Sequence, residues 1–194
     1  MTWEWVSRAF LAAVLVAAAI TDLRRGTVYN WLTYPAVLIG LALGAAAGAA
    51  AGDAGDGFIN HFLGMAFCFG VLLAAYVLGG MGGGDVKLMA AVGAILGWPG
   101  ALHAVFYSFA VGAAVGLIVL VWRGQVRLAL RRLWMAVRIL PLPTAKMEDA
   151  VPVSTFRVPF GFAVAVGTLW YLAEEIIGGS LWDGASRLVS SLSG

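Results

Sequence analysis

Residues 101–122 read ALHAVFYSFAVGAAVGLIVLVW, a run of 22 positions without Asp, Glu, Lys or Arg. About 20 apolar residues in a helix cross the roughly 30 Å hydrocarbon core of a bilayer, so this run predicts a transmembrane helix. Four further predominantly apolar runs of comparable length cover residues 5–21, 31–51, 58–79 and 158–178. The chain is 62% hydrophobic and 11% charged, with a mean hydropathy of +0.93, whereas soluble proteins contain about 25% charged residues. These values indicate an integral membrane protein.

A sixth apolar run, residues 86–98, is shorter than the others. As an α-helix, about 13 residues rise only about 20 Å. Pro99 closes the run and suits the first turn of the next helix. If the far end of this run reaches the membrane interface, Asp85 at its near end lies below the membrane surface. The sequence therefore predicts an all-α polytopic membrane protein with six transmembrane helices, one of them short.

Ten of the twelve Lys and Arg residues fall in loops on one side of such a six-helix arrangement. Because Lys and Arg favour cytoplasmic loops, we expect that side to face the cytoplasm and both chain termini to lie outside. The cytoplasmic side then carries Asp22, Asp85 and the loop 123–157, and residues 179–194 form a short extracytoplasmic tail. The first run is expected to be retained, because the charged residues 22–25 follow it in place of a signal-peptide cleavage site.

Arginines and large apolar side chains alternate in the cytoplasmic loop. The residues concerned are Arg127, Arg131, Arg132 and Arg138 with Leu128, Leu130, Leu133, Trp134 and Val137. The pattern is typical of an amphipathic helix that lies in the membrane interface on anionic lipid. A plain topology signal explains it equally well. Since the basic residues sit beside membrane spans, the sequence carries no nucleic-acid-binding signature.

Small residues and a single cysteine bear on packing. Glycine recurs every four residues at Gly40, Gly44 and Gly48, and again at Gly112 and Gly116, a spacing that allows helices to approach closely in lipid. The single cysteine, Cys68, lies inside an apolar run. One cysteine excludes an intramolecular disulfide and a cysteine-based zinc site, so it is expected to face lipid or to pack in the core.

Two aspartates stand at the borders of apolar runs. Asp22 follows the first run, and Asp85 follows three glycines, Gly82, Gly83 and Gly84. Ionisable groups at membrane depth are costly and usually functional. In one alternative, Asp85 is a helix N-cap and Asp22 pairs with the arginines after it. That alternative leaves the glycine run unexplained, because glycine supplies close backbone approach and flexibility that a peptide substrate requires and a cap does not. We interpret the two aspartates as an aspartyl protease pair.

Such a carboxylate pair has a defined chemistry. Two carboxylates a few ångströms apart cannot both ionise readily, so the pair shares one proton and titrates as a unit. One member then acts as general base on a water while the other donates a proton to the scissile carbonyl. In one interpretation, the positive charge of Lys87 acts on the Asp85 carboxyl group or meets the substrate backbone. In the other, Lys87 only sets the topology and extends its side chain to the membrane surface. Asn30 either orients a carboxylate or caps the second helix.

The stretch from Gly82 to Met89, GGGDVKLM, resembles the GxGD-x-K-L signature of type IV prepilin peptidases, a family of GxGD membrane aspartyl peptidases. Residues 22–25, followed by residues 28–30, resemble the family's first aspartate site. The element around Pro159 and Gly161 is similar to the one that opens the family's last helix. The resemblance covers residues 1–178 and implies that they form a six-helix membrane peptidase domain. Tyr29 stands where the family has proline, which leaves the turn before Asn30 less rigid.

The resemblance implies a hydrolase that removes the basic leader peptide from type IV prepilins or pseudopilins at the cytoplasmic side of the bacterial inner membrane. It makes Asp22 and Asp85 the catalytic residues. The supporting residues are Gly82, Gly83, Gly84, Lys87, Asn30, Pro159 and Gly161. Such enzymes need no metal or organic cofactor, and the expected partners are the prepilin precursor and the lipid bilayer, with no oligomeric state implied. Many family members also methylate the new N-terminus and carry an N-terminal domain with paired CxxC motifs. This sequence shows no such motifs, so cleavage without N-methylation is expected, as in the short members linked to tight-adherence pili.

Two other classes of protein are compatible with the residues alone. In a small channel or transporter, Asp22 and Asp85 would face a glycine-lined cavity and relay protons or bind a cation. Such a protein would tolerate Asp→Glu in part and would cleave no peptide. A non-catalytic scaffold of a pilus or secretion system would keep its function after loss of both aspartates. Cleavage of a prepilin precursor therefore distinguishes the three classes.

Overall fold

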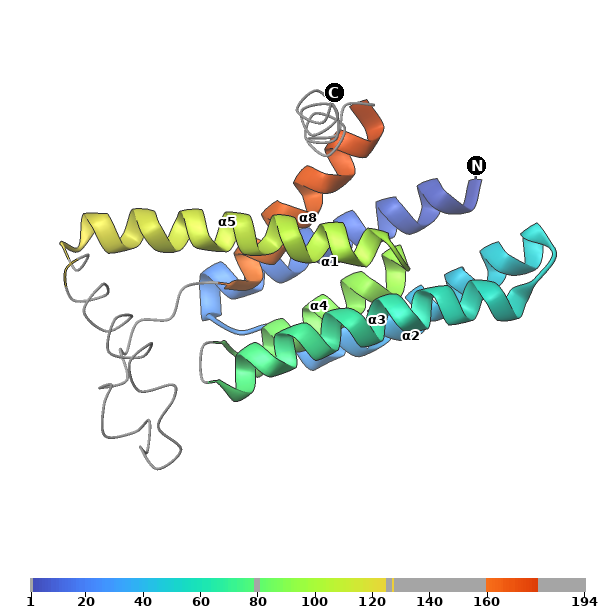
Figure 1. Cartoon of the computed structure of the whole chain (residues 1–194), viewed down its shortest axis with the longest axis horizontal. Coiled ribbons are helices and arrows are strands. Elements are labelled where there is room, and N and C mark those ends of the chain that lie inside the picture. Colours follow the sequence, from blue (N-terminus) through green and yellow to red (C-terminus); the bar gives the residue numbers. More distant parts are fainter. Residues whose placement is uncertain (1, 79–80, 125–126, 128–159, 178–194) are drawn as a thin grey trace, which may run out of the picture. The chain divides into compact units, whose positions relative to one another are not determined.

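The structure, a computed structural model, describes residues 2–78, 81–124, 127 and 160–177, and every element within these ranges is an α-helix (Figure 1). The helices are α1 (Thr2–Arg25), α2 (Asn30–Ala51), α3 (Ala54–Val77), α4 (Gly83–Leu96), α5 (Gly100–Trp122) and α8 (Phe160–Ile177). Five of them, all except α4, are long and apolar enough to cross a membrane. The predicted all-α polytopic membrane fold is confirmed.

The chain divides into two compact units. The first unit, Met1–Val111 with Pro159–Gly194, holds α1 to α4, the first half of α5, and α8; the second unit, Gly112–Val158, holds the rest of α5. All contacts discussed below lie within the first unit. The predicted interfacial helix, apart from the exposed Arg127, and the predicted tail 179–194 lie outside the described residues.

Helix α4 is short and begins earlier than the apolar run suggests. It starts at Gly83, inside the glycine run, and ends at Leu96. Gly97, with a φ of +67°, follows its C-terminus and donates its N–H to the carbonyl oxygen of Gly93 at 2.9 Å. The 14 residues of α4 rise about 21 Å. The early start places Asp85 inside the first turn of the helix.

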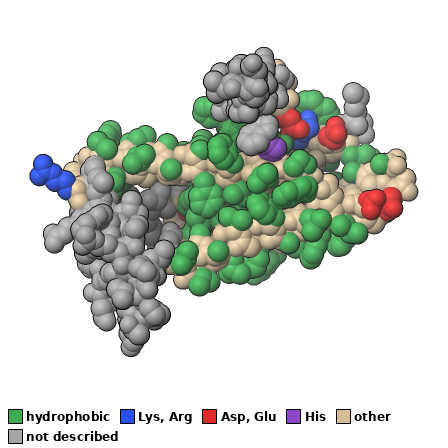
Figure 2. Space-filling view, viewed as in Figure 1, with side chains coloured by type: hydrophobic (Ala, Val, Ile, Leu, Met, Phe, Trp, Pro, Cys, Tyr) green, Lys and Arg blue, Asp and Glu red, His purple; other side chains and the backbone are tan. Residues whose placement is uncertain are grey.

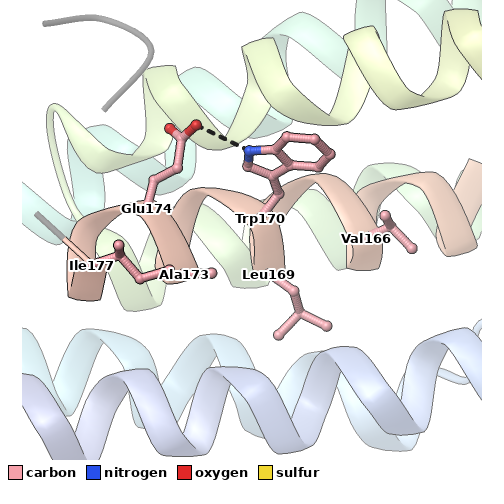
Figure 3. A pocket seen from close by; sticks show the side chains of 6 residues that line it. All are labelled: Val166, Leu169, Trp170, Ala173, Glu174 and Ile177. Carbon is pink, nitrogen blue, oxygen red and sulfur yellow. Dashed lines mark hydrogen bonds between the residues drawn. The ribbon is translucent and has the colours of Figure 1, made fainter. Parts of the chain in front are cut away.

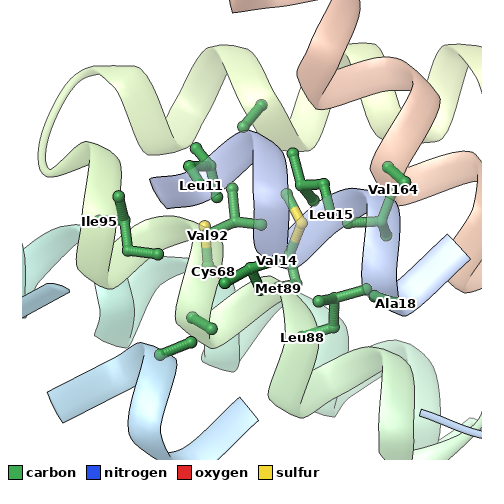
Figure 4. Close-up of a cluster of buried hydrophobic side chains, with 14 of the residues drawn as sticks. Leu11, Val14, Leu15, Ala18, Cys68, Leu88, Met89, Val92, Ile95 and Val164 are labelled. Atoms are coloured by element: carbon green, nitrogen blue, oxygen red, sulfur yellow. The ribbon is translucent and has the colours of Figure 1, made fainter. Parts of the chain in front are cut away.

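Helix α4 is also the central helix of the first unit, because it contacts α1, α2, α3 and α8. All residues from Leu88 to Ile95 are buried, as expected for a helix that is hydrophobic all round. Figure 4 shows Leu88, Met89 and Val92 packed with side chains of α1 and with Val164 of α8. Cys68 of α3 is fully buried in the same cluster, so its packing interpretation is the correct one.

The outer helices keep large apolar side chains exposed. Examples are Trp31, Leu38 and Leu117, each more than 60% exposed. Figure 2 shows hydrophobic side chains over most of the visible face of the described helices, with few charged ones. An apolar surface of this extent marks a membrane contact rather than a water-facing surface.

Glycines set the distance between α2, α3 and α4. A Cβ atom added at Gly64 of α3 would lie 2.6 Å from the carbonyl oxygen of Gly93 on α4, so these two backbones touch. One added at Gly40 of α2 would lie 2.8 Å from the carbonyl carbon of Ala94. Small residues permit such approach where lipid supplies no hydrophobic drive between helices. The predicted packing role of Gly40 is confirmed, whereas a Cβ atom at Gly116 would meet no atom within 4 Å among the described residues, so the role of Gly112 and Gly116 stays a prediction.

Near its C-terminus, α8 is fastened to its neighbours by charged side chains. Arg8 of α1 forms an ion pair with Glu175 at 2.7 Å. The hydroxyl of Tyr107 on α5 donates a hydrogen bond to Glu174. These contacts hold the C-terminal end of α8, opposite the end that begins at Phe160.

Candidate active site

Asp22 lies in the last turn of α1 and is buried, with 7% of its surface exposed. Its Oδ2 accepts a hydrogen bond at 3.0 Å from the backbone N–H of Phe162. Phe162 is in the first turn of α8, where N–H groups have no partner within the helix and favour an anion. The donor from α8 offsets part of the cost of burying a carboxylate.

Gly161 leaves the space in which this hydrogen bond forms. A Cβ atom there would lie 2.9 Å from Oδ2 of Asp22 and 3.1 Å from Cγ2 of Val28. Any side chain at this position would press on the carboxylate. Gly161 therefore lies directly against Asp22, whereas Pro159, which was predicted with it, lies outside the described residues.

The chain turns directly after Asp22. Gly26 has a φ of +62°, and its N–H donates to the backbone oxygen of Asp22 at 2.7 Å. Glycine is the usual residue at such a helix end, because a Cβ atom is disfavoured in the left-handed region. Both the backbone oxygen and the carboxylate of Asp22 are thus held, the first by Gly26 and the second by Phe162.

Asp85 is the third residue of α4 and is partly buried. Its Oδ2 accepts a hydrogen bond at 3.3 Å from the N–H of Gly82, which is the N-cap with a φ of −84° and a ψ of 145°. The alternative in which Asp85 is itself the N-cap is therefore wrong. A carboxylate in the first turn is stabilised by the positive end of the helix dipole, and its bond to the N-cap amide is half of a capping box.

The three glycines before Asp85 have different surroundings. Gly82 is exposed, and Gly83 and Gly84 belong to the first turn of α4. A Cβ atom at Gly83 would make an ordinary contact 3.7 Å from Tyr76, whereas one at Gly84 would lie 3.3 Å from Cβ of Val28. Close approach to Val28, rather than flexibility, explains the glycine at position 84.

Val28 joins the segments that carry the two aspartates. It lies in the turn between α1 and α2, is partly buried, and packs against the core. On one side it lies against Gly84, the residue before Asp85, and on another against Gly161, which lies against Asp22. The structure therefore brings both aspartate segments to the surroundings of one side chain.

Lys87 and Asn30 form a second link between the turn and α4. Nζ of Lys87 donates to Oδ1 of Asn30 at 2.9 Å and lies 5.4 Å from the ring centre of Tyr34. Asn30 is the first residue of α2, whose N-cap is Tyr29 without a side-chain capping bond. The side chain of Asn30 thus reaches α4 and does not cap α2, which corrects the capping interpretation.

Tyr29 keeps the backbone angle expected of the proline that it replaces. Its φ is −81°, close to the roughly −65° of proline. Nη1 of Arg25 donates to its hydroxyl at 2.5 Å, and the guanidinium carbon lies 5.9 Å from its ring centre. Side-chain contacts thus hold a turn that a proline ring would otherwise fix.

Val28 and Phe162 lie within stretches that resemble the family's motifs, but neither was predicted as a site residue. Phe162 acts through its backbone N–H, which every residue except proline carries, so its side chain gives no signal. Val28 looks like any apolar residue in a short turn. The signals that could have pointed to these two residues were their predicted neighbours: Gly161 directly before Phe162, and Asn30 two residues after Val28.

An open apolar hollow of about 510 Å³ lies away from these residues, on one face of α8. Its lining residues are Val166, Leu169, Trp170, Ala173, Glu174 and Ile177 (Figure 3). Trp170 donates its indole N–H to Glu174 at 3.0 Å, and it lies about 12 Å along the helix from Phe162. Among the residues that the structure describes, no three His, Cys, Asp or Glu could hold a metal ion together. We therefore place the candidate active site around the two aspartates.

The fold and this arrangement define a multi-pass helical membrane protein with two carboxylates held at helix ends beside one turn. The model of the type IV leader peptidase family matches residues 9–117, more than half of the chain, and the chain belongs to this family. The match includes Asp22, Asn30, Asp85 and Lys87 and ends before α8.

Three bacterial proteins named prepilin leader peptidase/N-methyltransferase are similar to this chain. The one from Burkholderia pseudomallei is 35% identical over 120 residues, which are 60% of this chain and 38% of the relative. That from Bacillus subtilis is 32% identical over 106 residues, 54% of this chain and 40% of the relative. That from Aeromonas hydrophila is 32% identical over 126 residues, 63% and 43% respectively. The chain thus spans about two fifths of the length of these relatives, and no solved structure matched it.

Proposed function

We propose that this chain is a membrane aspartic endopeptidase that removes the basic leader peptide from type IV prepilins or pseudopilins. The observation that carries the proposal is the meeting of the Asp22 and Asp85 segments at Val28, in a chain of the type IV leader peptidase family. The names of the three relatives, which all include prepilin leader peptidase, support this class of substrate.

In the proposed mechanism the two carboxyl groups share one proton. The ionised member removes a proton from a water, whose oxygen attacks the scissile carbonyl carbon, while the protonated member donates its proton to the carbonyl oxygen. On collapse of the tetrahedral gem-diol, the carboxylate that gave up its proton takes one from a hydroxyl of the intermediate and the C–N bond breaks. The leaving nitrogen takes the proton from the carboxyl group that received it from water, so the pair again shares one proton. Asp22 and Asp85 perform every proton transfer in this sequence.

The surroundings of the two aspartates suggest how substrate reaches them. Asp22 is buried and held through both its backbone and its carboxylate, whereas Asp85 is partly exposed and follows the exposed Gly82. We expect the scissile bond to arrive from the side of α4, where the carboxylate is more accessible. Lys87 and Asn30 would support the site by tying α4 to the turn that carries Val28.

The proposed location is the bacterial inner membrane, with both termini extracytoplasmic and the aspartates facing the cytoplasm. The support is the charge rule, since ten of twelve Lys and Arg residues fall on one side of the six-helix arrangement. In this proposal, the prepilin presents its basic leader on the cytoplasmic side, where the two aspartates lie.

Co-expression with candidate prepilin precursors tests the proposed function. Leader removal, followed on a gel, is expected for the wild type and is expected to be lost in Asp22→Ala and Asp85→Ala. Asp53→Asn is a matched control, because Asp53 is an exposed N-cap of α3 that binds the amides of Gly55 and Asp56, and asparagine caps a helix as well as aspartate does. Cleavage that persists in both alanine variants would refute the peptidase, and loss of cleavage in the control would show that the assay reports folding.

A further inference from the structure

We propose that Val28 is a positioning residue that sets the separation between Asp22 and Asp85. The proposal rests on the peptidase function above and adds a residue through which the two carboxyl groups are kept at a working distance. It starts from a single side chain that lies against two glycines from different helices, Gly84 of α4 and Gly161 of α8.

Val28 lies so close to both glycines that a side chain at either position would press on it. An added Cβ at Gly161 would lie 3.1 Å from Cγ2 of Val28, and one at Gly84 would lie 3.3 Å from its Cβ and 3.4 Å from its backbone nitrogen. Each glycine adjoins a different aspartate: Gly84 precedes Asp85 in the chain, and Gly161 lies against the carboxylate of Asp22. A shift of Val28 would therefore change the space available to one aspartate segment relative to the other.

Valine suits a spacer because its side chain is stiff. A β-branched residue has restricted χ1, so its width between two neighbours does not change by rotation. The packed surroundings transmit displacements instead of absorbing them. Val28 also packs against the core cluster, which fixes the spacer relative to the helices.

The backbone around Val28 is tied at both ends of the turn. Before it, the N–H of Gly26 bonds to the backbone oxygen of Asp22 at 2.7 Å. After it, the side chain of Asn30 accepts a hydrogen bond from Lys87 of α4 at 2.9 Å. The turn is thus connected to the Asp22 helix on one side and to the Asp85 helix on the other, with Val28 between these two connections.

The proposed role has a kinetic consequence. Two carboxyl groups share a proton only at short separation, and a misplacement of about 1 Å can cost about a hundredfold in rate. Val28→Ala removes both methyl groups, including Cγ2, the one that lies nearest the Gly161 position. We expect kcat to fall at least about tenfold with KM within about threefold of wild type, because the defect lies in the spacing of the reacting groups.

Val28→Thr is the matched conservative variant, since threonine has the same shape and is also β-branched. It is expected to retain most of the wild-type kcat. A purely structural role would lower the midpoint of thermal unfolding in Val28→Ala without this selective loss of kcat. Equal kcat values for Val28→Ala and wild type would overturn the proposal, as would equal losses in the alanine and threonine variants.

A pair of double variants tests the geometry more closely. In the Gly84→Ala variant, the new methyl group presses on Cβ of Val28. In the Gly84→Ala/Val28→Ala double variant the turn can retreat toward Gly161, so cleavage is expected to recover in part relative to Gly84→Ala alone. Gly161→Ala also presses on Oδ2 of Asp22, at 2.9 Å, and this clash remains in the Val28→Ala background, so no recovery is expected. Recovery of both variants, or of neither, would contradict a spacer between these two glycines.

A measurement without cleavage separates this proposal from the proposed function. In a Cys68→Ala background, cysteines at positions 22 and 85 report on separation through the rate of disulfide formation in isolated membranes under a fixed oxidant. Replacing Val28 with alanine is expected to change this rate more than twofold, whereas threonine leaves it unchanged. If the wild type cleaves no precursor, the proposed function fails, yet the disulfide rates still decide whether Val28 sets the spacing; equal rates would overturn it.

Discussion

The backbone N–H of Phe162 donates a hydrogen bond to Oδ2 of Asp22 at 3.0 Å, although the two residues are 140 positions apart. This contact makes α8 part of the candidate site, even though the family match ends at residue 117. The hydrogen bond and the glycine beside it belong to the same helical turn. The first turn of α8 therefore both binds the carboxylate and leaves room for it.

Gly161→Ala should impair cleavage more than it impairs folding. The added methyl group would lie 2.9 Å from Oδ2 of Asp22 and 3.0 Å from its Cγ, so the carboxylate must move. We expect kcat to fall at least about tenfold, since small displacements of reacting groups are costly. Cleavage kinetics of purified protein in nanodiscs, together with the midpoint of thermal unfolding, measure the two effects.

Gly70→Ala provides the control for this variant. Gly70 lies within α3, and a Cβ atom there would meet nothing within 4 Å in the part of the chain that the structure describes. Alanine has a higher helix propensity than glycine by about 1 kcal/mol, so this variant should be as stable as wild type or slightly more stable, with normal cleavage. Normal cleavage by Gly161→Ala as well would show that Asp22 is not confined as the structure indicates.

Gly64→Ala should destabilise the fold itself. Its Cβ would lie 2.6 Å from the carbonyl oxygen of Gly93 and 2.8 Å from the carbonyl carbon of Gly97, and backbone atoms cannot move aside as side chains can. Overpacking of this kind typically costs about 1–3 kcal/mol. The free energy of unfolding in detergent micelles, compared with Gly70→Ala on the same helix, measures the cost. Equal stability of the two variants would mean that α3 and α4 do not pack through their backbones.

The helices follow from the sequence because long apolar runs must form hydrogen-bonded helices in lipid. The start of α4 was less predictable, since Gly83 and Gly84 have low intrinsic helix propensity and resemble a flexible loop. In the structure Gly84 lies in the first turn of α4 close to Val28, and tertiary packing commonly overrides such a weak preference. This is why Asp85 was expected at the helix border but lies at its third position.

Gly26→Ala tests whether the turn after Asp22 depends on backbone conformation. Position 26 has a φ of +62°, and an added Cβ would meet no atom of the described residues within 4 Å, so the substitution tests the backbone conformation. Left-handed conformation costs a residue other than glycine roughly 1–2 kcal/mol, while asparagine tolerates it better.

The expected order of thermal stability is therefore wild type, then Gly26→Asn, then Gly26→Ala. Cleavage should follow the same order, because this turn holds the backbone oxygen of Asp22. An alanine variant as stable as the wild type would contradict the left-handed conformation at Gly26.

The bond between Lys87 and Asn30 should be visible in a double-mutant cycle. Lys87→Met and Asn30→Leu each remove the 2.9 Å hydrogen bond, and once one partner is gone, loss of the other should add little. We expect each single variant to slow cleavage several-fold and the double variant to be no slower than the worse single one. Fully additive losses would show that the two side chains act separately.

The candidate site was only partly readable from the sequence. Asp22 and Asp85 stood out because carboxylates are rare beside apolar runs, and Gly161 was named from a resemblance. Val28 and Phe162 lie within the resembling stretches, but their roles, a shape and a backbone N–H, depend on how distant segments pack and were not predicted. The site residues could be predicted from the sequence, but the residues that contact them could be identified only from the structure.

The central claim is that Asp22 and Asp85 act as one catalytic unit. It is tested most directly by the rate of precursor cleavage in proteoliposomes containing wild type, Asp22→Asn, Asp85→Asn or the double variant. Removal of either member of a unit costs about as much as removal of both, so each single variant should lose at least about a thousandfold, roughly 4 kcal/mol of barrier, and the double variant no more. Substantial cleavage by either single variant, or losses that multiply in the double variant, would contradict the account.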